Sequence, residues 1–140
     1  MKAGHILMLS CILLSSAAFA QKIAPGAVPK AVSSVFIKDF PGVMAEWELN
    51  NGCYTAIFEQ NKYMMKTVYN ASGARLETDV AITEAELPES TREYISHYSP
   101  TISEATKVIR ANDHVSFKVL AGSQYMEFDG KGNHMATANK

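Results

Sequence analysis

Residues 53–82 read CYTAIFEQNKYMMKTVYNASGARLETDVAI, and this stretch decides the fold. β-branched and aromatic residues alternate with polar ones in three runs, as in strands that bury one face. The runs cover residues 53–59, 63–69 and 75–82. Connections of three and five residues, which contain Asn and Gly, join them, so neighbouring strands must run antiparallel. The stretch therefore predicts a β-meander.

A helix and one more strand are predicted before the meander. From Pro29 onward apolar residues recur at helical spacing, and Pro41 followed by Gly42 ends the periodic run. The apolar positions are Val32, Val35, Phe36 and Phe40. Residues 43–49 then alternate as a strand, with Trp47 on the apolar side. We expect Trp47 in the core; the alternative is a partner-binding anchor, since tryptophan is enriched at interface hot spots.

The second half of the chain follows the same plan. Pro88 opens another helical stripe, and Ser99-Pro100 stops it. Strands are predicted at 102–110, 114–120, 124–129 and 134–137, divided by polar turns. Between the halves, Thr83 and Glu86 have the spacing of a capping box, in which hydroxyl and carboxylate bond the first backbone amides of a helix. We expect a turn there and the main helix from Pro88.

Pairing the two halves aligns Pro29 with Pro88 and Gly73 with Gly132. The predicted fold class is therefore α+β, with two tandem helix-plus-antiparallel-sheet repeats forming one curved sheet and the helices on one face. The first repeat would span 28–82 and the second 83–140, with 28–137 as one domain. Residues 21–27 lack periodicity and are predicted to be a flexible leader.

Residues 1–20 have the features of an export signal. Lys2 supplies a positive start, an apolar run follows, and Ala18 and Ala20 place small residues at a cleavage site before Gln21. Cleavage is expected between Ala20 and Gln21. The alternative is an uncleaved membrane anchor, but the apolar run is shorter than the roughly 20 residues that span a bilayer. We expect a periplasmic or secreted protein without stable membrane insertion after cleavage.

The charge balance argues against nucleic acid as a partner. The 140 residues carry 13 Lys and Arg against 14 Asp and Glu, a formal net charge of −1. Proteins that bind phosphate backbones show a basic stripe, and here the basic residues are scattered.

No residue set has the spacing of a catalytic or metal site. His97, His114 and His134 are far apart in the sequence, and no cysteine pair accompanies them. Cys53 begins a strand-like run and is expected to be a small strand residue; the alternative is a reactive or intermolecular thiol. We therefore predict a non-enzymatic protein that uses no cofactor and no metal.

The pattern of helix starts, aromatic positions and turns resembles a known family. Its elements are Val28-Pro29-x-Ala31-Val32, Phe40-Pro41-Gly42, Trp47-Glu48, Gly52-x-Tyr54-x-Ala56-x-Phe58, an Asn/Asp-x-x-Gly turn, and a second round from Leu87-Pro88. Over residues 27–137 the pattern is similar to the PepSY-like, β-lactamase-inhibitor-protein-like domains exported by bacteria that have an outer membrane. The resemblance implies a curved antiparallel sheet and an extracytoplasmic location. The inhibitor proteins of that family bind an enzyme on the concave sheet face, but their contact residues do not map onto this sequence.

Alternation along the strands predicts which residues would form such a face. With Ala56, Phe58 and Tyr69 directed to the core, their neighbours must point the other way. The predicted partner-binding face consists of Ile57, Met64, Lys66, Val68, Lys118 and Leu120. Its apolar members make this face less polar than a solvated sheet, which is typical of a binding surface.

Two functions are compatible with these features. The first is an exported module that binds or inhibits an envelope protein through the open sheet face. The alternative is a periplasmic sensor or carrier of a small ligand or metal, with His97 or His114 contributing. The sequence leaves the partner, the oligomeric state and any link to a β-lactamase open.

Overall fold

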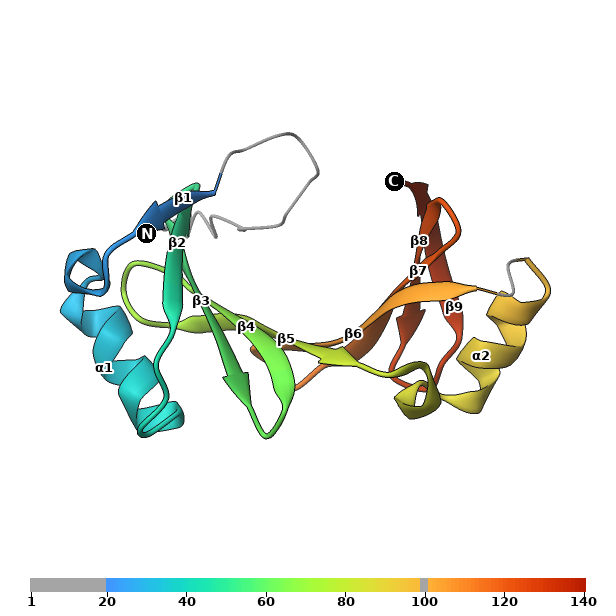
Figure 1. The fold of residues 1–140 in the computed structure, drawn as a ribbon, viewed down its shortest axis with the longest axis horizontal. Coiled ribbons are helices and arrows are strands. Elements are labelled where there is room, and N and C mark those ends of the chain that lie inside the picture. Colours follow the sequence, from blue (N-terminus) through green and yellow to red (C-terminus); the bar gives the residue numbers. More distant parts are fainter. Residues whose placement is uncertain (1–19, 99–100) are drawn as a thin grey trace, which may run out of the picture.

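The computed structural model describes residues 20–98 and 101–140. In these residues the chain forms one sheet of nine antiparallel strands whose spatial order follows the sequence (Figure 1). The strands are β1 (Gln21–Ile23), β2 (Glu46–Asn50), β3 (Cys53–Gln60), β4 (Tyr63–Tyr69), β5 (Arg75–Ile82), β6 (Ile102–Arg110), β7 (Val115–Ala121), β8 (Gln124–Asp129) and β9 (His134–Asn139). The helices are α1 (Lys30–Asp39) and α2 (Glu89–Ser96), preceded by the 3-10 turns η1 (Pro25–Ala27) and η2 (Glu84–Glu86).

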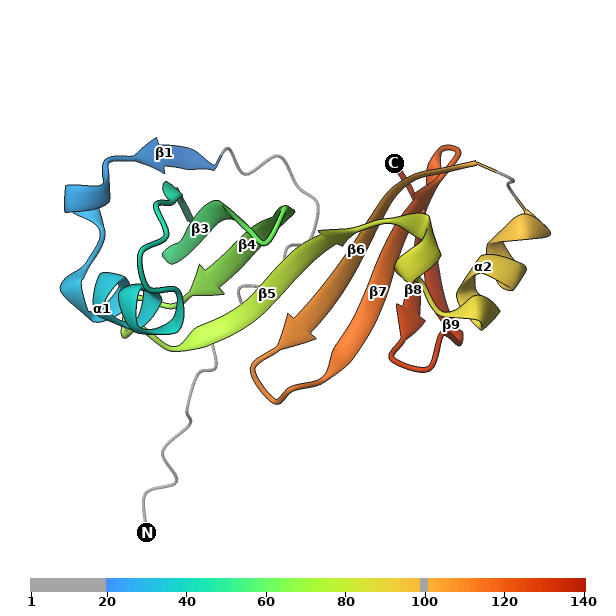
Figure 2. The ribbon, with the colours of Figure 1, turned by 60° about the horizontal axis from the view of Figure 1, so that its bottom comes forward.

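The prediction of an α+β fold made of two tandem helix-plus-sheet repeats is wrong. The ladder continues without a break from β5 to β6, where Glu77 faces Arg110 and Ile82 faces Ala105. The helices have only 10 and 8 residues, so the protein is mainly sheet, and they lie at opposite ends of it (Figures 1 and 2). The pairing of β5 with β6 makes the two halves one sheet and satisfies backbone groups that would otherwise lie at two sheet edges.

Residues 21–23 form a strand instead of the flexible leader that the sequence predicted. β1 pairs with β2, with Ile23 opposite Trp47, and the Ile23 side chain packs against the core. Lys22 adds a 3.1 Å ion pair to Glu46, although both side chains are exposed and contribute little to stability. One apolar residue in a polar segment has no periodicity, so the pattern could not reveal this strand.

Two hydrophobic clusters hold the helices to the two ends of the sheet. In the first, Phe36 of α1 contacts Trp47 and Phe58 edge to face, with ring centroids 5.3 and 5.2 Å apart. Such contacts add about 0.5–1.5 kcal/mol to the burial of the rings. Trp47 is therefore a core residue, as predicted. The second cluster combines Leu87, Ile95, Ala105, Phe117, Val119, Ala121, Met126 and Phe128.

Local signals in the sequence predicted most elements with close boundaries. The strands expected at 63–69, 75–82, 102–110 and 124–129 coincide with β4, β5, β6 and β8. The capping box is confirmed, because Glu86 Oε2 accepts hydrogen bonds from the Thr83 N–H at 2.8 Å and from its hydroxyl at 2.9 Å. Pro88 caps α2, also as expected.

The predicted signal peptide lies outside the described residues except for Ala20, which is exposed and directly precedes β1. Within residues 20–98 and 101–140, no helix has the length and hydropathy that a membrane span requires.

Candidate functional site: the open face of the sheet

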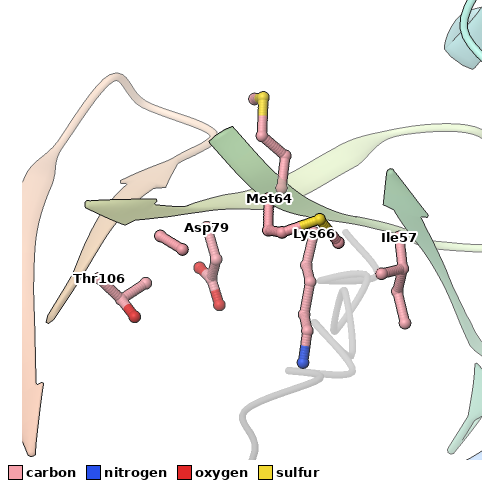
Figure 3. Close-up of a pocket in the computed structure, with 7 residues that line it drawn as sticks. Ile57, Met64, Lys66, Asp79 and Thr106 are labelled. Atoms are coloured by element: carbon pink, nitrogen blue, oxygen red, sulfur yellow. The ribbon is translucent and has the colours of Figure 1, made fainter. Parts of the chain in front are cut away.

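The face of the sheet that points away from the core clusters is called the open face here. Residues paired across a ladder share a face. Ile57 pairs with Lys66, Lys66 with Asp79, and Asp79 with Val108, so these side chains leave the sheet on one side. The buried residues Ala56, Thr67 and Thr78 pair on the other side. Figure 3 shows Ile57, Lys66, Asp79 and Thr106 extending together from the open face.

The structure brings together half of the residues predicted for a partner-binding face. Ile57, Met64 and Lys66 line one pocket of about 140 Å³ (Figure 3). Met64 is 50% exposed, Lys66 is exposed and Ile57 is half-buried. The remaining wall comes from Met65, Asp79, Ala81 and Thr106. The pocket thus combines aliphatic side chains with one ammonium, one carboxyl and one hydroxyl group.

The other three predicted residues lie outside this pocket. Val68 is half-buried on β4 opposite Glu77, and Lys118 is exposed on β7 opposite Thr106. Leu120 is only 3% exposed, because it lies between Glu104 of β6 and Tyr125 of β8 in the ladder. Leu120 therefore offers almost no surface to a partner.

Asp79 lines the pocket and was missed by the sequence reasoning. Its Oδ1 atom is buried and has no hydrogen-bond partner among the described residues. Burial, followed by the like charge of Glu77 and a hydrogen bond to it, raises the pKa of Asp79 to about 7, while Lys66 and Lys118 oppose the shift. The register of β5 against β4, in which Lys66 pairs with Asp79, places the two side chains on the same face.

Charged groups surround Asp79 on the neighbouring strands. Arg110 Nε lies 3.6 Å from Glu77 Oε2, and Arg110 also donates a 3.1 Å hydrogen bond to the Ser116 hydroxyl. The Lys118 ammonium lies 4.8 Å from the centre of the Tyr125 ring, a cation–π contact. In the described part of the chain, Lys66 and Lys118 form no ion pair.

The three histidines do not converge on a site. His97 caps α2, His114 precedes β7, and His134 on β9 stacks on Tyr94 with ring centroids 4.6 Å apart. Over residues 20–98 and 101–140, no group of three or more His, Cys, Asp or Glu residues could hold a metal ion. The pocket on the open face offers the ammonium group of Lys66, the carboxyl group of Asp79, the hydroxyl group of Thr106 and apolar side chains.

Comparisons with known proteins give a likeness in fold. No protein-family model matches the sequence, and the search of curated proteins finds no match. A candidate periplasmic protein from Bacteroides eggerthii has a TM-score of 0.72 at 16% identity, covering 80% of this chain and 88% of that one. A DUF2874 family protein from Bacteroides ovatus has a TM-score of 0.64 at 22% identity, covering 79% and 86%. A BLIP-like protein from Bacteroides fragilis has a TM-score of 0.61 at 15% identity, covering 79% and 86%.

These likenesses support part of the resemblance seen in the sequence. The β-lactamase-inhibitor-protein-like (BLIP-like) part of the resemblance has a counterpart in fold among the solved structures. The PepSY-like part has none among these neighbours. At such low identity the comparison carries the fold alone: the chain has the fold of a BLIP-like protein and of DUF2874 family proteins from Bacteroides.

Proposed function

We propose that this protein is a non-enzymatic module of the bacterial envelope that binds or inhibits another protein through the open face of its sheet. The observation that carries the proposal is the exposed apolar surface around the pocket. Met64 is 50% exposed and Ile57 is half-buried in the pocket, and Val68 is half-buried further along β4. All three lie on the side of the sheet away from the core clusters. Apolar side chains that lie outside the core and remain exposed to solvent are typical of a surface that binds a partner.

The shape of the sheet and the fold likeness support this function. The end strands rise on the same side of the central strands, which makes the open face concave (Figure 1). A concave face can surround a convex segment of another protein and bury more area than a flat one. The structural neighbours named as periplasmic and BLIP-like favour an envelope location and a non-catalytic role, as does the export signal predicted at residues 1–20.

Affinity capture with matched variants tests the proposal. The tagged chain is used as bait in envelope extract of its own cells, beside a Met64→Asp, Val68→Asp double variant. The control is Ile37→Asp, Met44→Asp, which adds the same charge at residues 63% and 92% exposed, on α1 and in the loop before β2. Circular dichroism and thermal melts verify that each bait is folded.

One protein that the wild type and the control capture, and that the open-face variant loses, would support the proposal. The contact is then reconstituted from the two purified proteins. Equal capture by all three baits would exclude this face as the binding surface. A partner lost only with the control variant would place binding near α1 instead.

A further inference from the structure

The two edges of the sheet differ in how they are protected against pairing with further strands. In the described residues the edge strands are β1 and β9, at opposite ends of the strand order (Figure 1). Edge strands expose unpaired backbone groups, and charged residues, proline or a very short length usually prevent them from pairing with another chain. β1 has only three residues, and its central residue Lys22 forms an ion pair with Glu46. The β1 edge is therefore protected.

The β9 edge lacks this protection over most of its length. The six residues of β9, His134–Asn139, include no Lys, Arg, Asp, Glu or Pro, and all but the first are exposed. The register against β8 is irregular only at the start of β9, where it shifts between Glu127 and Phe128. The helix α2 contacts β9 through Tyr94, which stacks on His134, the first residue of the strand. Residues 136–139 are therefore a regular, uncharged and exposed edge.

The pairing of β9 with β8 defines which backbone groups of this edge point outward. The Lys140 N–H, directly after β9, donates a 2.9 Å hydrogen bond to the Ser123 carbonyl group, directly before β8. Backbone groups of successive residues point to opposite sides of an antiparallel strand. Those of Ala138 therefore point to β8 as well, and those of Thr137 and Asn139 point away from the sheet. Thr137 lies near the middle of the exposed edge and offers a free N–H and a free C=O group there.

We propose that β9 pairs antiparallel with β9 of a second copy of this chain, about a two-fold axis at Thr137. The inference is independent of the proposed function. In this register the outward N–H and C=O groups of Thr137 bond those of the same residue in the second copy. Ala136 of each copy then faces Ala138 of the other. Because the two-fold axis is perpendicular to the sheet, both open faces lie on the same side, and the contact closes as a dimer.

A second copy is favoured as the occupant because β9 is complementary to itself. In a two-fold pair every charge on the strand would meet its own counterpart, and like charges opposite each other are destabilising, but β9 carries no charge. Thr137 faces Thr137, a cross-strand pair that stabilises sheets, and the small side chains of Ala136 and Ala138 face each other without crowding. Met135, which is 56% exposed, faces Asn139 of the second copy and becomes partly covered.

Charge variants at the two-fold axis test the proposal. The protein is purified from the envelope of its own cells, and sedimentation velocity measures its mass between about 5 and about 500 µM. One strand pair buries less than the ~1,200 Å² of a stable interface, so the dimer should be transient, with a Kd of roughly 10–100 µM. Thr137→Lys and Thr137→Glu place like charges opposite each other and should each raise the Kd roughly tenfold or more. An equimolar mixture of the two variants should dimerise again, since opposite charges then meet at the axis.

The matched control is Met44→Lys, which adds the same charge at a residue 92% exposed in the loop before β2 and should dimerise as the wild type does. Circular dichroism verifies that each variant is folded, as expected for a substitution at the exposed Thr137. A wild type that stays monomeric at every concentration, or a dimer that Thr137→Lys leaves intact, would overturn the inference. So would a mixture of the two charged variants that remains monomeric, or growth of the wild type into assemblies larger than a dimer.

Discussion

The backbone of Gly73 lies so close to Ala31 that a Cβ atom on the glycine would clash with the Ala31 carbonyl oxygen. Gly73 belongs to the β4–β5 turn, and Ala31 lies in the first turn of α1. The turn is shaped by Asn70, whose side-chain oxygen accepts hydrogen bonds from the backbone N–H groups of Ser72 and Ala74, both at 3.0 Å. This contact sets how closely α1 approaches the sheet.

Replacing Gly73 by alanine should destabilise the protein by roughly 2–4 kcal/mol, through the clash with Ala31 and through strain at a φ of +89°. Urea unfolding followed by circular dichroism measures the loss. The matched control is Gly42→Ala, where φ is +77° but no atom lies within 4 Å of the added Cβ. That variant should lose only about 1 kcal/mol, the cost of the left-handed backbone. Equal losses would show that backbone conformation, and not the contact with α1, makes glycine necessary at position 73.

Tyr69 is fully buried, at 0% exposure. Its buried hydroxyl group has no hydrogen-bond partner among the described residues. Burial, with a smaller contribution from the charge of Asp39, raises its pKa to about 12, so the hydroxyl stays neutral. Tyr69→Phe keeps the ring in the core and removes the unsatisfied group. We expect it to stabilise the protein by about 0.5–1 kcal/mol. Thermal melts decide the matter, and a loss of stability would mean that a bound water satisfies the hydroxyl.

Glu86 connects the capping box to β4, because the Tyr63 hydroxyl donates a 2.5 Å hydrogen bond to its Oε1 atom. This hydrogen bond, followed by the carboxylate charge, raises the pKa of Tyr63 and, for the same reason, lowers that of Glu86. Glu86→Gln should therefore bring the pKa of Tyr63 down towards its usual value. NMR titration of ¹³C-labelled tyrosine measures the change. Glu84→Gln, in the same 3-10 turn, is the control and should leave Tyr63 unaffected.

The sequence predicted those elements whose signals are local. Alternation and short polar turns defined β4, β5, β6 and β8, and the proline starts located both helices. The pairing of Glu77 with Arg110 joins strands that a helix separates in the sequence, and no local pattern encodes that contact. β1 was missed for the same reason: its one apolar residue, Ile23, is explained only by its pairing with Trp47 on β2, which no local pattern shows.

The sequence predicted those residues of the candidate site that depend on alternation within one strand, and it missed those that depend on contacts between strands. Alternation within single strands correctly put Ile57, Met64 and Lys66 on one surface, because period two is a local property. It could not show that Leu120 is covered by its neighbours on β6 and β8. Asp79 and Thr106 enter the pocket only through cross-strand register, which the sequence of either strand alone does not specify.

Asp79 should make the protein less stable as the pH rises, which is the opposite of the usual effect of a carboxyl group. Its pKa is raised from 3.8 to about 7 by burial first and then by Glu77. The folded protein therefore binds a proton more tightly than the unfolded chain does. The stabilising contribution is complete below about pH 4 and is lost as the pH rises through 7, where the carboxylate is ionised in the folded state as well.

Asp79→Asn removes this dependence. At pH 8 the variant should be more stable than the wild type by roughly 1–2 kcal/mol, which is below the full linkage value because the carboxyl group is partly solvated. The advantage should shrink steadily from pH 7 to pH 4. Denaturant unfolding at pH 5 and pH 8 measures it, with Glu59→Gln, an exposed carboxylate on β3, as the control that should follow the wild type. A destabilised Asp79→Asn at pH 8 would mean that the carboxylate is needed for the fold through Lys66 or Lys118, and that it does not carry an unfavourable charge.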